Sequence, residues 1–175
     1  MNTVELMQYS LGFAFDMLGQ LVSDLTQEQA DWQPPGNANP IGALYWHIVS
    51  YVDQLAHAWA IGQEPLKQRA GWQEKVVIAL PPADPEDPMG TLRAIRVGVS
   101  IDLPALHEYA QATADTLQEW LASLTPEDLE RTIETTMGEL SLAQMLEAYV
   151  IWHINVHCGE ISAIKGCQGL TGYPW

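Results

Sequence analysis

Apolar residues recur at alternating steps of three and four positions in four separate stretches of the chain. This spacing places them on one face of an α-helix and is typical of helices that pack against one another in a bundle. The first stretch carries Val4, Met7, Leu11, Ala14, Leu18, Leu21 and Leu25. The third carries Leu103, Leu106, Ala110, Thr113, Leu117, Trp120 and Leu124. The pattern therefore predicts an amphipathic helix over each of these two stretches.

The second and third helices have recognisable boundaries. In the second, we expect Asn39 to be the N-cap and Pro40 the first helical residue, because proline lacks an amide proton that this position leaves unpaired in any case. The apolar stripe of this helix ends near Gly62. In the third, Asp102 or Ser100 is the expected N-cap.

The fourth helix has the clearest start signal in the chain. Ser141 and Gln144 have the spacing of a capping box, in which each side chain accepts a hydrogen bond from the other residue's backbone amide. We expect this helix to run from about Leu142 to Lys165 and to end at Gly166.

The segment between the second and third helices differs in composition from the rest. Residues 63–99, which include LPPADPEDPMG, hold most of the proline and glycine between helices, and they predict a long, partly ordered connection with a helical turn around Leu92–Val97. No extended strand pattern competes with the helices. The fold class predicted is therefore all-α, a four-helix bundle with a long connection between helices two and three, in a single domain over residues 1–175.

Composition and charge restrict the classes of partner. Acidic residues outnumber basic ones 22 to 7, giving a formal net charge of −15, so we expect no nucleic acid and no anionic membrane surface as a partner. There is no apolar run of about 18 residues that predicts a membrane span. The start MNTVELMQYS lacks the basic residues of a signal peptide, so we expect a cytoplasmic protein with Cys158 and Cys167 reduced.

The fourth helix places polar residues on the face that it should bury. On a wheel of about 100° per residue, His153 lies near the centre of the apolar stripe, His157 lies toward one side, and Glu160 lies between Leu142 and Leu146. Histidines four residues apart lie one above the other on a helix, close enough to bind one ion.

A third histidine is available from the second helix. His47 lies beside Leu44 and Tyr51 at the flank of the apolar stripe, so it is the expected partner of the pair. His57 lies nearly opposite the stripe and is predicted to be on the surface. His107 lies off the main stripe of the third helix and has no nearby partner in sequence.

Two interpretations of the histidines remain open from spacing alone. A single inward histidine is more often a core residue with one hydrogen bond than a metal ligand. Two buried imidazoles without metal or hydrogen-bond partners would each cost roughly 1–3 kcal/mol, however, and a divalent ion would satisfy both. Three neutral imidazoles would also leave coordination positions open, as in catalytic zinc sites.

The sequence WHINVHCGEISAIKGCQGLTGYPW resembles the C-terminal signature of the DinB-like superfamily of four-helix bundles, which includes the YfiT-like proteins. The matching residues are His47, His153 and His157, then Gly159-Glu160-Ile161 and Gly169 through Pro174. The resemblance implies a divalent metal, commonly zinc or nickel, held by the three histidines. Some relatives are thiol transferases that use bacillithiol or mycothiol, some are mycothiol-dependent maleylpyruvate isomerases, and others are described as hydrolases.

The chain departs from the family pattern at Glu160, where relatives usually carry glutamine. Glu160 is one turn beyond His157, so it can orient a ligand histidine, join the coordination or act as a general base. Alternatively, it simply emerges into solvent.

Two functions follow as hypotheses. The first is a metal-dependent enzyme, a thiol S-transferase or hydrolase, that activates a low-molecular-weight thiol or water for attack on a small electrophile. His47, His153 and His157 would hold the metal, Glu160 would be the base, and Tyr51 could donate a hydrogen bond to substrate. The second is a non-catalytic metal-binding bundle that acts as a binding or stress-response protein. A homodimer is expected, with tryptophans such as Trp32, Trp72 and Trp175 either in the interface or covering the core ends. Neither cysteine is expected to be catalytic.

Overall fold

The structure, a computed structural model, describes residues 1–79, 99–135 and 138–173. The chain is mostly helical, which confirms the all-α expectation. The long helical segments are α1 (Thr3–Val22), α3 (Ile41–Leu55) continued by the π-helix η1 (Ala56–Ile61), α6 (Leu103–Ala122), and the series α7 (Leu142–Met145), π-helix η4 (Leu146–Ile151) and α8 (Trp152–Cys167). Within the described ranges, none of these helices combines the length and apolarity that crossing a membrane requires.

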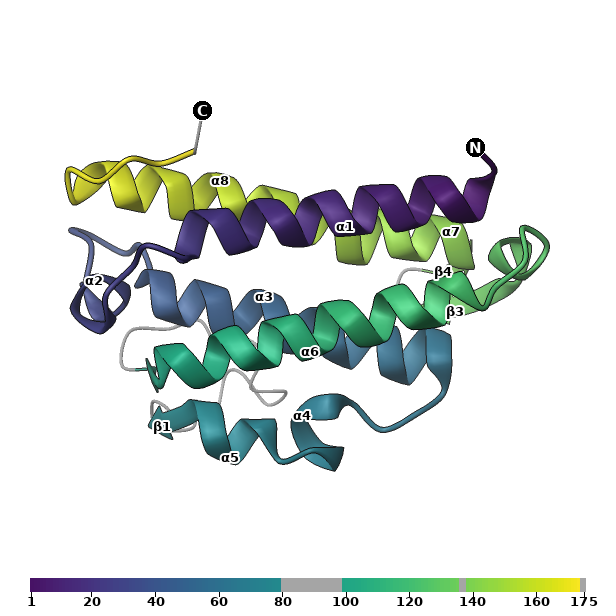
Figure 1. The fold of residues 1–175 in the computed structure, drawn as a ribbon, viewed down its shortest axis with the longest axis horizontal. Coiled ribbons are helices and arrows are strands. Elements are labelled where there is room, and N and C mark those ends of the chain that lie inside the picture. The colour runs from purple at the N-terminus through teal and green to yellow at the C-terminus, as the bar shows by residue number, and fades with distance from the viewer. Residues whose placement is uncertain (80–98, 136–137, 174–175) are drawn as a thin grey trace.

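The long segments pack side by side around one core. Figure 1 shows α1 beside α8 along the top of the molecule, with α3 and α6 below them. Helix α3 contacts both α6 and α8, so its buried face packs against these two helices. Large apolar side chains that are almost fully buried, among them Leu18, Ile48, Leu106 and Ile161, fill the space between the four segments. The stripes read from the sequence for the first and third helices therefore form buried faces.

Capping residues explain where the long helices begin and end. Asp102 caps α6 by accepting from the amide of Ala105, and Ser141 forms the expected capping box with Gln144. At α3 the N-cap is Pro40 rather than Asn39, so the helix begins one residue later than expected. The segment ends as predicted at Gly62, whose φ of 74° is the left-handed conformation that glycine adopts without strain.

Short elements join the long ones. They are the helices α2 (Gln27–Asp31), α4 (Leu66–Arg69) and α5 (Trp72–Val76), and the 3₁₀ helix η3 (Asp128–Glu130). Two antiparallel strand pairs are also present, β1 (Val77–Ala79) with β2 (Ser100–Ile101) and β3 (Thr132–Thr135) with β4 (Gly138–Ser141). The sequence pattern did not indicate these strands, because each is too short to show an alternation. The turn expected around Leu92–Val97 lies outside the described residues.

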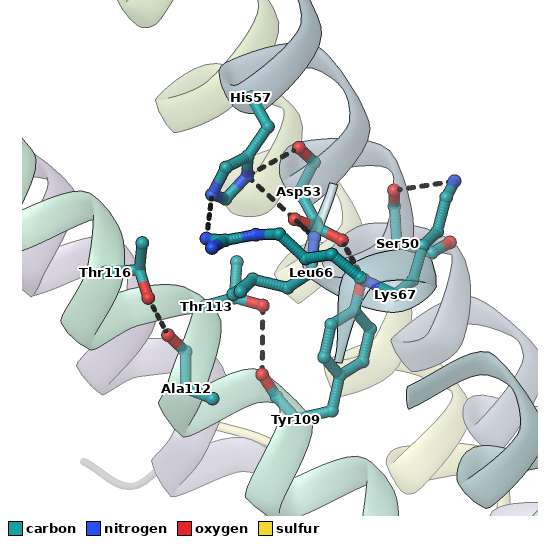
Figure 2. A network of polar contacts seen from close by, with 10 residues as sticks. Ser50, Asp53, His57, Leu66, Lys67, Tyr109, Ala112, Thr113 and Thr116 are labelled. Atoms are coloured by element: carbon teal, nitrogen blue, oxygen red, sulfur yellow. Dashed lines mark hydrogen bonds and ion pairs between the residues drawn. The ribbon is translucent and has the colours of Figure 1, made fainter. Parts of the chain in front are cut away.

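The first part of the connection is anchored by a buried carboxylate on α3 (Figure 2). The two oxygens of Asp53 accept hydrogen bonds from the backbone amides of Leu66 and Lys67, at 2.9 and 2.8 Å, which lie at the start of α4. They also accept from the Tyr109 hydroxyl on α6 at 2.6 Å and from His57 Nδ1 at 2.8 Å. One fully buried side chain thus ties α3, α4 and α6 together.

His57 was expected on the surface, and that expectation is wrong, because its side chain is fully buried. Its Nδ1 donates to Asp53, and its Nε2 lies 3.4 Å from a guanidinium nitrogen of Arg69 on α4. The wheel placed His57 opposite the stripe of its own helix, but α4 covers that face. His57 is therefore buried by α4, on the face of its helix that would be exposed to solvent if α4 were absent.

Candidate metal centre

Three histidines meet between α3 and α8. One ring nitrogen from each of His47, His153 and His157 lies within 4.8 Å of the other two. The ring centroids are 5.0 Å apart for His47 and His153, 5.1 Å for His47 and His157, and 4.5 Å for His153 and His157. The structure therefore brings together the three residues that the sequence singled out, from two helices and from far apart in the chain.

The histidines of α8 lie at the flank of its buried stripe. That stripe is formed by Ile154, Cys158 and Ile161, whereas His153 and His157 are half-buried on the adjoining face. The prediction that His153 lies at the centre of the apolar stripe is therefore wrong. A position at the flank leaves an imidazole packed on one side and able to reach a ligand on the other.

Burial keeps two of the imidazoles neutral at physiological pH. Burial, with a smaller contribution from His157, lowers the pKa of His47 from 6.5 to about 4. Burial, followed by the neighbouring His47 and His157, lowers the pKa of His153 to about 3. A neutral imidazole keeps one nitrogen lone pair, and this is the form that binds metal ions.

The residues fit a metal ion on a further observation. Within the described part of the chain, Nε2 of His153 is buried and has no hydrogen-bond partner. An orphaned buried polar atom costs roughly 1–3 kcal/mol, so proteins seldom retain one without a ligand for it. Three convergent imidazoles could hold a transition metal ion and leave positions open for a further ligand. Imidazole donors alone do not select among such ions.

Glu160 positions one of the three rings. Its Oε2 lies 2.6 Å from Nδ1 of His157, a contact that favours the tautomer in which Nδ1–H donates to the carboxylate and Nε2 is left for a metal ion. The side chain of Glu160 is 51% exposed, which differs from the buried face that the wheel gave it. This contact is that of a residue that orients a histidine, and the role of Glu160 as a base stays a prediction.

An open cleft of about 680 Å³ adjoins the cluster. It is lined by His153 and by Tyr51, Leu140, Glu147, Ala148, Tyr149 and Trp152. The Tyr51 ring stacks on His153 with centroids 4.3 Å apart. Apart from Tyr51 and His153, sequence reasoning missed the residues of this cleft, although the aromatic pair in YVIWH before His153 was a usable signal.

The remaining polar residues that the sequence raised lie elsewhere. His107 is half-buried and lies 3.3 Å from the hydroxyl of Tyr45 through its Nδ1, away from the cluster. Cys158 is buried, and burial raises the pKa of its thiol to about 12, so it behaves as a small apolar residue. Cys167 is exposed. Trp72 stacks on Tyr109 and so covers the core rather than facing solvent alone.

Fold and site together define a mostly helical protein with a three-histidine cluster that could bind a metal ion. The sequence model of the DinB superfamily matches residues 11–161, so the chain belongs to the DinB superfamily, whose members bind metals. The fold is similar to the crystal structure of a conserved protein from Enterococcus faecalis, with a TM-score of 0.74 and 22% sequence identity over 94% of this chain and 96% of that chain. The comparison with curated proteins gave no match.

Proposed function

We propose that this protein is a metal-dependent enzyme that transfers a low-molecular-weight thiol, or failing that water, to a small electrophile. In this proposal the scaffold is a DinB-type four-helix bundle, and His47, His153 and His157 hold a divalent ion, zinc or nickel. The observation that supports it is the convergence of three half-buried imidazoles, one with an orphaned nitrogen, beside a cleft large enough for a substrate.

The residues of the chain have distinct roles in such a reaction. When bound, the ion would supply Lewis acidity, which favours a thiolate over a thiol and brings the pKa of water toward about 7. Glu160 holds the ring of His157 in one orientation and tautomer. The thiol sulfur forms a bond to the electrophilic carbon, the leaving group departs with the electrons of the bond that breaks, and Glu160 or water accepts the thiol proton.

Metal analysis and a thiol screen test this proposal. Protein purified without a chelating tag is analysed for bound metals and assayed with chlorodinitrobenzene and a panel of small thiols. We expect about one zinc or nickel ion per chain and turnover that His153→Ala abolishes. His107→Ala is the matched control, because His107 is a half-buried histidine outside the cluster, and it should keep both metal and turnover. A metal-loaded protein that transfers no thiol and hydrolyses no ester would contradict the enzyme hypothesis.

A second candidate is a non-catalytic metal-binding protein that acts as a homodimer. It is favoured by large apolar side chains that are exposed on α1 and α8, namely Leu6, Tyr9, Phe13, Trp152 and Val156. An unpaired apolar face of this kind is common in interfaces. A dimer by analytical ultracentrifugation, together with metal binding and no turnover, would favour this function. For either candidate, the net charge of −15 argues against nucleic acid as a partner. A cytoplasmic location stays a prediction.

A further inference from the structure

The cleft beside the histidine cluster has walls suited to one chemical class of ligand. Its wall consists mainly of the aromatic rings of Tyr51, Tyr149 and Trp152 and the apolar side chain of Leu140. Its volume of about 680 Å³ falls within the range of roughly 300–1,000 Å³ that small-molecule sites occupy. Trp152 is 61% exposed, an unusual degree for so large an apolar residue, and it therefore has an uncovered face beside the cleft.

The aromatic walls are held in place by their neighbours. Tyr51 stacks on His153, and Tyr149 packs edge-on against Trp59 with centroids 5.8 Å apart. Tyr149 belongs to the π-helix η4 and Trp59 to the π-helix η1. Short π-helical segments occur frequently at functional sites, and η4 supplies three of the residues that line the cleft, Glu147, Ala148 and Tyr149. Tyr51 and Tyr149 are thus held in place before any ligand arrives, which reduces the entropy lost on binding.

Charge narrows the class of ligand further. Of the described residues that line the cleft, Glu147 is the one with a formal charge, and it is exposed. The chain as a whole carries a net charge of −15. Apart from the ion proposed at the histidine cluster, an anionic ligand would find no cationic partner on these walls. Over the rest of the cleft it would meet an unfavourable potential.

We propose that this cleft is the binding site of the electrophile and that it selects a neutral, planar aromatic molecule over an anionic one. This inference rests on the proposed function, because it places the acceptor of the thiol next to His153. The aromatic ring of the ligand would stack against Trp152 and Tyr149, and its reactive carbon would face the histidine cluster. Stacking fixes the plane of the ring, so attack of the sulfur on that carbon needs little further ordering.

Binding without turnover provides the test. Isothermal titration calorimetry is carried out on metal-free protein in chelator, so that a carboxylate cannot bind the proposed ion. It measures the Kd of dinitrotoluene, which is neutral and lacks a leaving group, and of dinitrobenzoate, which has the same ring and a negative charge. We expect the neutral compound to bind more tightly. Trp152→Ala should raise its Kd about three- to tenfold, the loss expected for one aromatic contact. Tyr9→Ala is the matched control, because Tyr9 is a similarly exposed aromatic on α1 (66% against 61%), and it should leave the Kd unchanged.

The charge argument has its own variant. Glu147→Gln removes the negative charge at the cleft. It should lower the Kd of dinitrobenzoate alone and so reduce the difference in affinity between the two compounds. Because Glu147 and Trp152 are both exposed, neither substitution is expected to affect folding, and circular dichroism checks this.

Failure of this inference is separable from failure of the proposed function. If dinitrotoluene binds as expected and no thiol is transferred, the cleft is a ligand site and the proposed reaction is wrong. If chlorodinitrobenzene is turned over and Trp152→Ala changes neither its KM nor the Kd of dinitrotoluene, the electrophile binds elsewhere and the inference is overturned. Equal affinity for the neutral and anionic compounds would overturn the selectivity.

Discussion

Replacing His153 with phenylalanine should stabilise the metal-free protein and remove most of the stabilisation that zinc gives the wild type. Phenylalanine keeps an aromatic ring to stack on Tyr51, whose centroid lies 4.3 Å from that of His153. It also removes Nε2, the buried nitrogen without a partner. In metal-free protein, therefore, His153→Phe deletes an unsatisfied polar atom and loses no hydrogen bond through that atom.

The expected changes in the free energy of unfolding differ between chelator and zinc. Removing the orphaned nitrogen should raise the free energy of unfolding by up to about 1–3 kcal/mol in chelator, less any strain from the larger ring. Adding zinc at about 100 times its Kd should stabilise the wild type by about 2.7 kcal/mol, because only the folded state brings the three imidazoles together. The variant keeps two of the three histidines and should gain much less. The variant is thus the more stable protein in chelator, and zinc at this concentration should cancel or reverse that difference.

Urea denaturation at neutral pH, followed by circular dichroism with a reductant for the two cysteines, measures both differences. His107→Phe is the control: it loses the contact with Tyr45, and its stability should change equally with and without zinc. The reasoning is refuted if zinc stabilises His153→Phe as much as the wild type. It is also refuted if the variant in chelator is less stable than the wild type, since the imidazole would then have a structural role that the geometry does not account for.

Three further predictions concern the charged side chains. Burial acts to raise the pKa of Asp53, but hydrogen bonds from His57, Tyr109 and two backbone amides together lower it below 3.8. The ionised Asp53 therefore stabilises the folded protein above pH 3.8, and this stabilisation is lost as the pH falls through the pKa of the folded state. Asp53→Asn should reduce the free energy of unfolding by about 3–5 kcal/mol at neutral pH and by less in acid, as measured by urea denaturation across that range. Glu160→Ala should weaken zinc binding about 10–100-fold in a competition assay with a chelating dye, whereas Glu160→Gln, which can still accept from the histidine at 2.6 Å, should retain most of the affinity. Lys165→Met should lower the free energy of unfolding by about 1–3 kcal/mol, as measured by thermal denaturation. The buried Lys165 side chain donates a hydrogen bond of 2.8 Å to the carbonyl of Leu21, and methionine has no donor to replace it.

The helices, and the caps at Asp102 and Ser141, could be predicted because they depend on local chemistry. The stripe from Val4 to Leu25 and the capping box at Ser141 each follow from residues within a few positions of one another. The pairing of His47 with the histidines of α8 was also predictable, since both helices carry their histidines on or beside an inward face. The metal and the substrate were not, because imidazoles suit several ions.

What could not be predicted depends on contacts between distant segments. The surface position expected for His57 assumed solvent beside that face of the helix. The face is instead covered by α4, which Asp53 holds through the amides of Leu66 and Lys67 (Figure 2). Nothing in residues 63–70 marks them as the cover of another helix. A pattern of periodicity describes one helix at a time and so cannot place a second layer.

The π-helix η4 explains both the error about His153 and the way the site is built. A helical wheel assumes about 100° per residue throughout, but η4 adds an extra residue to the turn between Leu146 and Ile151. Beyond it, the buried stripe passes to Ile154 and Cys158, about 100° from where an unbroken helix would place it. The shift leaves His153 beside the core instead of within it, facing His47. One extra residue thus lets a single helix bury an apolar stripe and still present two imidazoles to a ligand.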